Sequence, residues 1–108
     1  MKMGRPDRGT PRWYWEAAIG LMVVAQGHHR EASRRRVKRW GVAWVADEAN
    51  AALRAADFAA YNADLFERSG GFGLVLSGKV NKPARHYADR ARWIAEKAAK
   101  EVARARQT

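Results

Sequence analysis

The feature that most constrains the fold is a long segment without a helix breaker. Residues 42–69 contain neither Gly nor Pro and are rich in Ala. Gly and Pro interrupt regular structure, and Ala has the highest helix propensity of the amino acids. This segment, with the cationic residues that precede it, therefore predicts one long helix over residues 30–69.

The apolar surface of this predicted helix is too wide for a helix that lies half in water. At about 100° per residue, its polar side chains fall on one narrow stripe, and apolar side chains cover roughly two-thirds of the circumference. Alanines recur at alternating steps of three and four residues, so another helix can approach closely. This seam consists of Ala49, Ala52, Ala56, Ala59 and Ala63. Its partner is a helix of the same chain or of a second copy, and we expect self-association through it.

Two further helices are expected on either side of the long one. Thr10 and Pro11 suit a helix start and Gly27 suits a stop, which places the first helix over residues 11–26. The last helix is expected over residues 83–106, where apolar residues recur at helical spacing. These are Ala84, Tyr87, Ala88, Ala91, Ile94, Ala95, Ala98, Val102 and Ala105. In a chain so rich in Ala, we expect the aromatic side chains to supply most of the core volume.

These elements predict an all-α fold with three main helices in a single helical domain, residues 10–108. The second and third helices should form a long antiparallel hairpin across the Gly-rich loop that connects them. Residues 1–9 combine Gly and Pro with basic side chains, and we expect them to form a flexible basic arm.

The Gly-rich loop contains the spacing of a phosphate-binding loop, in Gly73, Gly78 and Lys79. In such a loop, backbone amides surround phosphate oxygens. Here Val80 occupies the position at which magnesium coordination needs Ser or Thr, and no parallel sheet precedes the loop. The sequence therefore disfavours nucleotide hydrolysis, and we expect residues 74–76 to form a short extended piece that closes one end of the core.

Charge is unevenly distributed along the chain. It carries 21 Lys and Arg against 11 Asp and Glu, a formal net charge of +10. The net charge is +5 over residues 28–46, −3 over 47–69 and +5 over 82–108. Such a balance favours acidic partners, which are nucleic acid, an anionic membrane surface or an acidic protein. The absence of Cys excludes a disulfide framework and Cys-ligated zinc.

Two groups of basic residues form the candidate binding site. One is the cationic block at residues 34–39, and the other is a stripe of cations with one indole along the last helix. The hairpin would bring the two groups together, with Trp93 stacking on a base and the cations contacting phosphates. The candidate residues are Arg34, Arg35, Arg36, Lys38, Arg39, Arg90, Trp93, Lys97, Lys100 and Arg104. An ordinary solvated face is the alternative interpretation of the same pattern.

No group of residues suited to catalysis or metal binding is apparent in the sequence. Asp47 and Glu48 are adjacent and diverge on a helix, so they do not form an acid and base pair. His28 and His29 are also adjacent, which is a poor arrangement for a metal site. The sequence therefore predicts a non-enzymatic protein with no catalytic residues, metal or cofactor.

The resulting prediction is a small basic binding module with three possible classes of partner. The first is nucleic acid or a nucleoprotein complex, held by phosphate contacts. The second is an acidic protein surface, contacted by an inhibitor or by a small subunit of a larger assembly. The third is a membrane, contacted through residues 13–27, an apolar run shorter than the ~20 residues that span a bilayer. We expect a cytoplasmic location.

Overall fold

The computed structural model describes residues 6–37 and 41–107. In chain order these residues form α1 (Pro11–Val37), α2 (Val42–Arg68), the short α3 (Gly71–Leu76) and α4 (Ala84–Gln107). No strand occurs within these ranges. The all-α class with three main helices is therefore confirmed.

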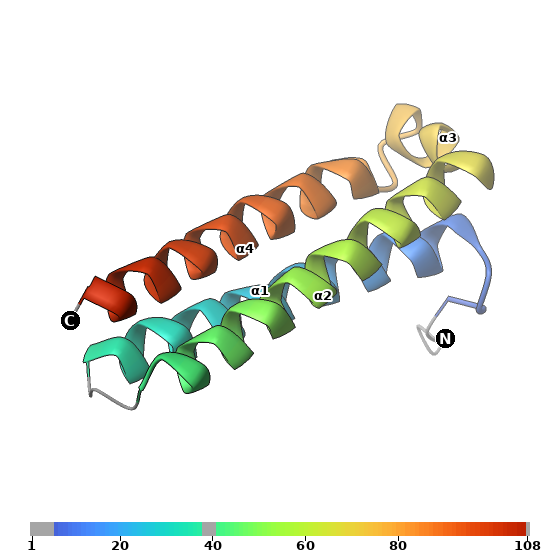
Figure 1. Cartoon of the computed structure of the whole chain (residues 1–108). Coiled ribbons are helices and arrows are strands. Elements are labelled where there is room, and N and C mark those ends of the chain that lie inside the picture. Colours follow the sequence, from blue (N-terminus) through green and yellow to red (C-terminus); the bar gives the residue numbers. More distant parts are fainter. Residues whose placement is uncertain (1–5, 38–40, 108) are drawn as a thin grey trace, which may run out of the picture.

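The three long helices run side by side, each antiparallel to the one before it (Figure 1). The resulting rod measures 52 × 26 × 19 Å. We call the end where α1 and α4 finish and α2 begins the Arg36 end, and the opposite end, which carries α3, the α3 end. The expected antiparallel packing of the long helix against the last one is thus present, with α1 completing a three-helix bundle.

The boundary between the first two helices was predicted wrongly. Thr10 caps α1 as expected, because its Oγ1 accepts the Trp13 amide at 3.3 Å. The helix then continues through Gly27 to Val37, and α2 begins only at residue 42. A Gly inside a helix costs no more than about 1 kcal/mol relative to Ala, and fully buried alanines on either side of Gly27 keep α1 packed on the core.

The chain turns instead at Gly41, whose φ of 98° favours Gly. The cationic block consequently ends a helix rather than starting one. Arg34, Arg35 and Arg36 lie in the last turn of α1, where the negative end of the helix dipole stabilises cations. Lys38 and Arg39 lie outside the described residues.

Alanine, not aromatic side chains, fills most of the core. Phe66 and Val45 are the largest side chains that are fully buried among the described residues. Two tryptophans, Trp44 and Trp93, are each 49% exposed. The expectation that aromatic residues supply the core volume was therefore wrong, and the helices pack through small side chains that allow close approach.

The alanine seam of α2 is used within one chain. Ala52, Ala56, Ala59 and Ala63 have no exposed surface, and Ala49 is 7% exposed. They belong to one core cluster with the alanines of α1 and α4. In this fold the seam holds the bundle together and has no surface left for a second copy, so any self-association must use another face.

The Gly-rich connection forms a helix, not the extended piece that we expected. Amides after Gly73 donate to carbonyls of the same segment, as in Ser77 to Gly73 at 3.0 Å and Lys79 to Leu74 at 3.0 Å. Amides engaged in this way cannot surround a phosphate, so the phosphate-loop spacing has no structural counterpart here. Leu74 and the following Val75 do pack against the end of the core.

Polar contacts fix α4 against its neighbours near the α3 end. The Trp15 indole N–H donates to the Lys82 carbonyl at 2.7 Å, joining α1 to the segment before α4. Arg85 donates to Glu67 at 3.1 Å and also to Asp64, both on α2. These bonds, the one to Glu67 first, raise the pKa of Arg85 above its ordinary value, so its charge is permanent.

One of the three predicted partner classes was a membrane, contacted through residues 13–27, which lie in α1. Over the described residues, no helix combines the length and the apolar character required to span a bilayer.

Candidate anion-binding site

The fold brings the end of the cationic block next to the end of α4. Arg36 donates to Oε2 of Glu101 on α4, and Arg104 donates to the other oxygen of the same carboxylate at 2.8 Å. Glu101 is buried, with 5% of its surface exposed. The predicted convergence of Arg36 and Arg104 is thus present, with a buried carboxylate between them.

The described arginines of the block are all engaged with carboxylates of this chain. Arg34 contacts Glu31 at 3.1 Å, and Arg35 contacts Glu48 of α2 at 3.1 Å. The Arg35 guanidinium also lies 5.1 Å from the centre of the Trp44 ring. Arg35 and Arg36 have less than a third of their side chains exposed, whereas Arg34 is 59% exposed.

The block therefore does not project from the core as a whole. Arg34 points to solvent, while Arg35 and Arg36 connect α1 to the two neighbouring helices. These two arginines are primarily structural, because removing either one takes a charged partner from a poorly exposed carboxylate of a neighbouring helix. Glu48 would then keep only its contact with His28, and Glu101 only its contact with Arg104.

The cationic stripe of α4 is exposed and much less engaged. Arg90, Lys97 and Lys100 have no ion pair with a carboxylate in the described part of the chain. Trp93 lies between two of them, with the Arg90 guanidinium 5.6 Å and the Lys97 ammonium 3.9 Å from its ring centre. The indole thus holds two cations at the surface through cation–π contacts while half of its own surface stays exposed.

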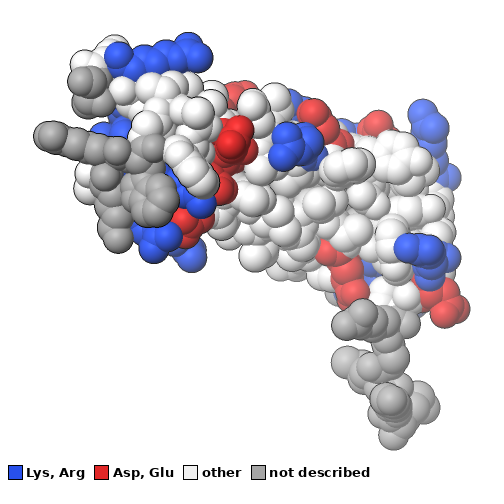
Figure 2. Space-filling model, turned by 60° about the horizontal axis from the view of Figure 1, so that its bottom comes forward, with Lys and Arg blue, Asp and Glu red and all other residues white. Residues whose placement is uncertain are grey.

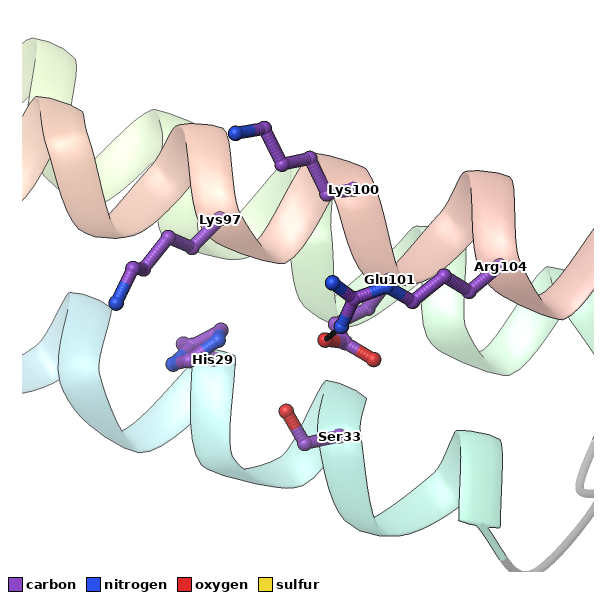
Figure 3. A pocket seen from close by; sticks show the side chains of 6 residues that line it. All are labelled: His29, Ser33, Lys97, Lys100, Glu101 and Arg104. Atoms are coloured by element: carbon purple, nitrogen blue, oxygen red, sulfur yellow. Dashed lines mark hydrogen bonds and ion pairs between the residues drawn. The ribbon is translucent and has the colours of Figure 1, made fainter.

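A pocket of about 320 Å³ lies between α1 and α4 at the Arg36 end (Figure 3). It is lined by His29, Ser33, Lys97, Lys100, Glu101 and Arg104. In Figure 3 the Lys97 side chain extends towards α1 beside His29, and the Ser33 hydroxyl points towards the gap between the helices. Lys100 extends to the other side of the α4 backbone, and the Arg104 guanidinium lies against Glu101. The pocket therefore presents several donors around one carboxylate that is already paired.

Basic residues are not confined to the Arg36 end. Figure 2 shows basic side chains gathered towards both ends of the molecule, with scattered basic and acidic side chains on the mostly uncharged surface between them. The α3 end carries Arg8, Arg12, Arg68, Lys79, Lys82 and Arg85. Our expectation that the hairpin gathers the basic charge at one end was too simple, and local pairing distinguishes the sites better than net charge.

Two other hollows are more apolar. One, of about 470 Å³, lies between α2 and α4 around Leu53 and Val102, with Arg92 and Arg106 among its lining residues. The other, of about 480 Å³, lies between the start of α1 and α2, around Phe58 and the neighbouring aromatic rings. Neither is lined by a buried carboxylate with cations around it, as the α1–α4 pocket is.

The sequence interpretation missed three residues of the pocket. Glu101 could have been identified from its spacing, because it continues the apolar series of Ala91, Ile94 and Ala98. A carboxylate at such a position is buried and therefore needs a partner. His29 and Ser33 share a face only if α1 continues past Gly27, so the wrong helix boundary concealed them.

No metal site is visible within residues 6–37 and 41–107, where no three His, Cys, Asp or Glu side chains gather as ligands. His28 does not lie in a linker as expected, but on α1, with Nδ1 2.7 Å from Oε2 of Glu48. No protein-family model matches the sequence, and comparisons with curated proteins and with solved structures give no significant match.

Proposed function

We propose that this protein is a non-enzymatic module that binds nucleic acid through phosphate contacts on the face formed by α4 and the end of α1. The observation that carries the proposal is the exposed stripe of Arg90, Lys97 and Lys100, which have no carboxylate partner among the described residues, around a half-exposed Trp93. A nucleic-acid partner also agrees with the expected cytoplasmic location.

The dimensions of the stripe suit a strand. From Arg90 to Arg104 the helix rises about 20 Å, enough to follow several successive phosphates. Neutralising phosphates with exposed cations releases counterions, which supplies affinity without reading the base sequence. Trp93 adds a surface on which a base can stack, so we expect single strands to bind at least as well as duplex.

The test is a salt series with a charge-matched control. Fluorescence anisotropy would measure binding of labelled single-stranded and duplex oligonucleotides to the protein at increasing salt. The test variant replaces Arg90, Lys97 and Lys100 with Gln. The control replaces Arg54, Arg68 and Lys79, which are also exposed, so both variants lose three charges.

The expected result is a steep loss of wild-type binding with salt. Removing three phosphate contacts should reduce the slope of log affinity against log salt by about 2 on single strands, and the control should keep most of the slope. Equal slopes for the two variants would show that net charge, and not the α4 stripe, is responsible. No binding at low salt would refute the proposal.

A second candidate is a protein interaction in which the basic face contacts an acidic protein surface. The observation that favours it is the number of large apolar side chains left exposed on α2, since Leu53 is 42%, Phe58 60% and Tyr61 61% exposed. Aromatic and apolar side chains of this kind are enriched at protein interfaces. Substituting Phe58 and Tyr61 with Ser should leave nucleic-acid binding unchanged, and a loss of nucleic-acid binding would tie this aromatic surface to the first proposal.

A further inference from the structure

The pocket between α1 and α4 includes polar side chains that form no hydrogen bond or ion pair within the described residues. His29 and Ser33, one turn apart on α1, have no side-chain hydrogen-bond partner among the described residues. Lys97 approaches them from α4 and has no carboxylate partner there either. An imidazole, a hydroxyl and an ammonium group therefore surround one space and can all donate to a ligand.

The balance of charge in the pocket favours an anion with more than one negative charge. Glu101 is already bound by Arg36 and Arg104, so its carboxylate does not neutralise Lys97 or Lys100. Three cations, Lys97, Lys100 and Arg104, line the pocket with one carboxylate, which leaves an excess of two positive charges with His29 counted as neutral. A phosphate monoester carries about −1.5 to −2 charge at neutral pH and accepts several hydrogen bonds, whereas a phosphodiester carries a single charge.

The shape of the pocket distinguishes an end of a strand from its middle. Its volume of about 320 Å³ is near the lower limit of pockets that bind small ligands. A phosphodiester within a strand must be followed on both sides by further nucleotides, which suits the open stripe of α4. A space bounded by helices on two sides instead suits a group that terminates the strand.

We propose that this pocket binds the terminal phosphate of a nucleic-acid strand, whose following nucleotides continue along α4 over Lys97, Trp93 and Arg90. The inference rests on the proposed function and specifies which part of the nucleic acid occupies the pocket. His29, Ser33, Lys97 and Arg104 are the groups that contact the phosphate.

The experiment compares three oligonucleotides of one sequence, carrying a 5′-phosphate, a 3′-phosphate or hydroxyls at both ends. Anisotropy at one salt concentration gives the ratio of affinities for each variant of the full chain. Charge-assisted hydrogen bonds to the terminal group should make one phosphorylated strand bind about tenfold more tightly than the hydroxyl strand. The phosphorylated strand that binds more tightly, with either a 5′- or a 3′-phosphate, identifies which end occupies the pocket.

Two variants and two matched controls locate the preference in the pocket. Ser33→Ala and Lys97→Gln should each reduce the ratio by about threefold or more. Ser77→Ala and Lys79→Gln make the same chemical changes at the α3 end and should leave the ratio unchanged. Circular dichroism of each variant would confirm that the helices are intact.

Each outcome decides the inference. Tenfold preference that falls in the pocket variants alone supports it. Affinities within twofold of one another for all three strands would overturn it while leaving the phosphate-binding face in place. A preference that survives Ser33→Ala and Lys97→Gln would also overturn it, because the phosphate then binds elsewhere. If none of the strands binds, this inference and the proposed function fail together.

Discussion

The basic residues of α4 fall into two groups that differ in their ion pairing. On the side towards α2, Arg85 is bound by Asp64 and Glu67, and Arg92 contacts Asp57 at 2.6 Å. Outside this contact with α2, the exposed α4 cations Arg90, Lys97 and Lys100 have no carboxylate partner within the described residues. One group of α4 arginines thus forms ion pairs with carboxylates of α2. The other group of cations forms no ion pair with a carboxylate of the described residues.

The difference follows from the acids available on each neighbouring helix. Asp57, Asp64 and Glu67 of α2 contact arginines of α4. Glu16 and Glu31 of α1 are instead contacted by arginines of α1 itself. A surface cation that the fold has not neutralised is the one available to an outside anion. In a chain of formal charge +10, pairing therefore separates structural cations from candidate binding cations, which the total charge does not.

The largest expected effect concerns the α3 turn, which connects α2 to α4. A Cβ at Gly71 would lie 2.5 Å from the ring and the carbonyl oxygen of Phe66, so Gly71→Ala should reduce the free energy of unfolding by about 3 kcal/mol. Gly73→Ala is the control, since a Cβ there meets nothing within 4 Å. Urea denaturation measures both, and equal stability of the two variants would contradict the close packing of Gly71.

The second effect concerns Glu101, the carboxylate that occupies the otherwise cationic α1–α4 pocket. Glu101→Gln should lower the free energy of unfolding by about 2 kcal/mol, because the charge-assisted bonds to Arg36 and Arg104 are weakened. The same change should strengthen oligonucleotide binding, since both arginines become available. Glu96→Gln on the exposed surface of α4 changes the net charge equally. If the two variants bind equally well, Glu101 does not restrain these arginines.

The third effect concerns Trp93, the indole that lies beside Arg90 and Lys97 on α4. Trp93→Leu should weaken single-strand binding about tenfold, corresponding to the loss of one stacked base. Trp44→Leu is a matched control, because both indoles are 49% exposed and both lie beside an arginine. Anisotropy with a single strand measures both. A similar loss in both variants would show that exposed tryptophan in general, rather than the α4 stripe, is responsible.

The smallest effect separates the two groups directly. Arg92→Gln removes an exposed ion pair and should cost about 0.5 kcal/mol of stability without a specific effect on binding. Lys97→Gln should leave stability unchanged and weaken oligonucleotide binding about threefold. Denaturation would measure the stability of both variants, and anisotropy would measure their oligonucleotide binding. Loss of binding in Arg92→Gln as large as in Lys97→Gln would abolish the distinction between the groups.

The sequence predicted the parts of the fold that depend on local signals. The residues after Pro83 predicted α4 almost to its ends, and hairpin topology predicted that Arg36 and Arg104 would meet. The Ala-rich run predicted the body and the C-terminal end of α2, but its start was placed at residue 30 instead of Val42. The end of α1 was missed because Gly27 was interpreted as a stop. Packing of α1 on the core outweighs the small local cost of that Gly, and tertiary contacts of this kind are absent from a local pattern.

The pairing of charges was beyond sequence reasoning for a different reason. Arg92 has Glu96 four residues further along its own helix, but it contacts Asp57 on α2. Which acid faces which base depends on the rotation of each helix about its axis, and the shape of the core fixes that rotation. The sequence places Asp57 and Asp64 on the polar stripe of the long helix, but it does not show that they face Arg92 and Arg85.

The alanine interior has a consequence for how this protein can change over evolutionary time. Almost every replacement of a buried Ala introduces a larger side chain, and the close-packed helices have no space for it. Sequence drift should therefore be slow at the buried alanines and fast on the outer surface. A distant homologue should be easier to recognise by the spacing of its small residues than by its overall identity.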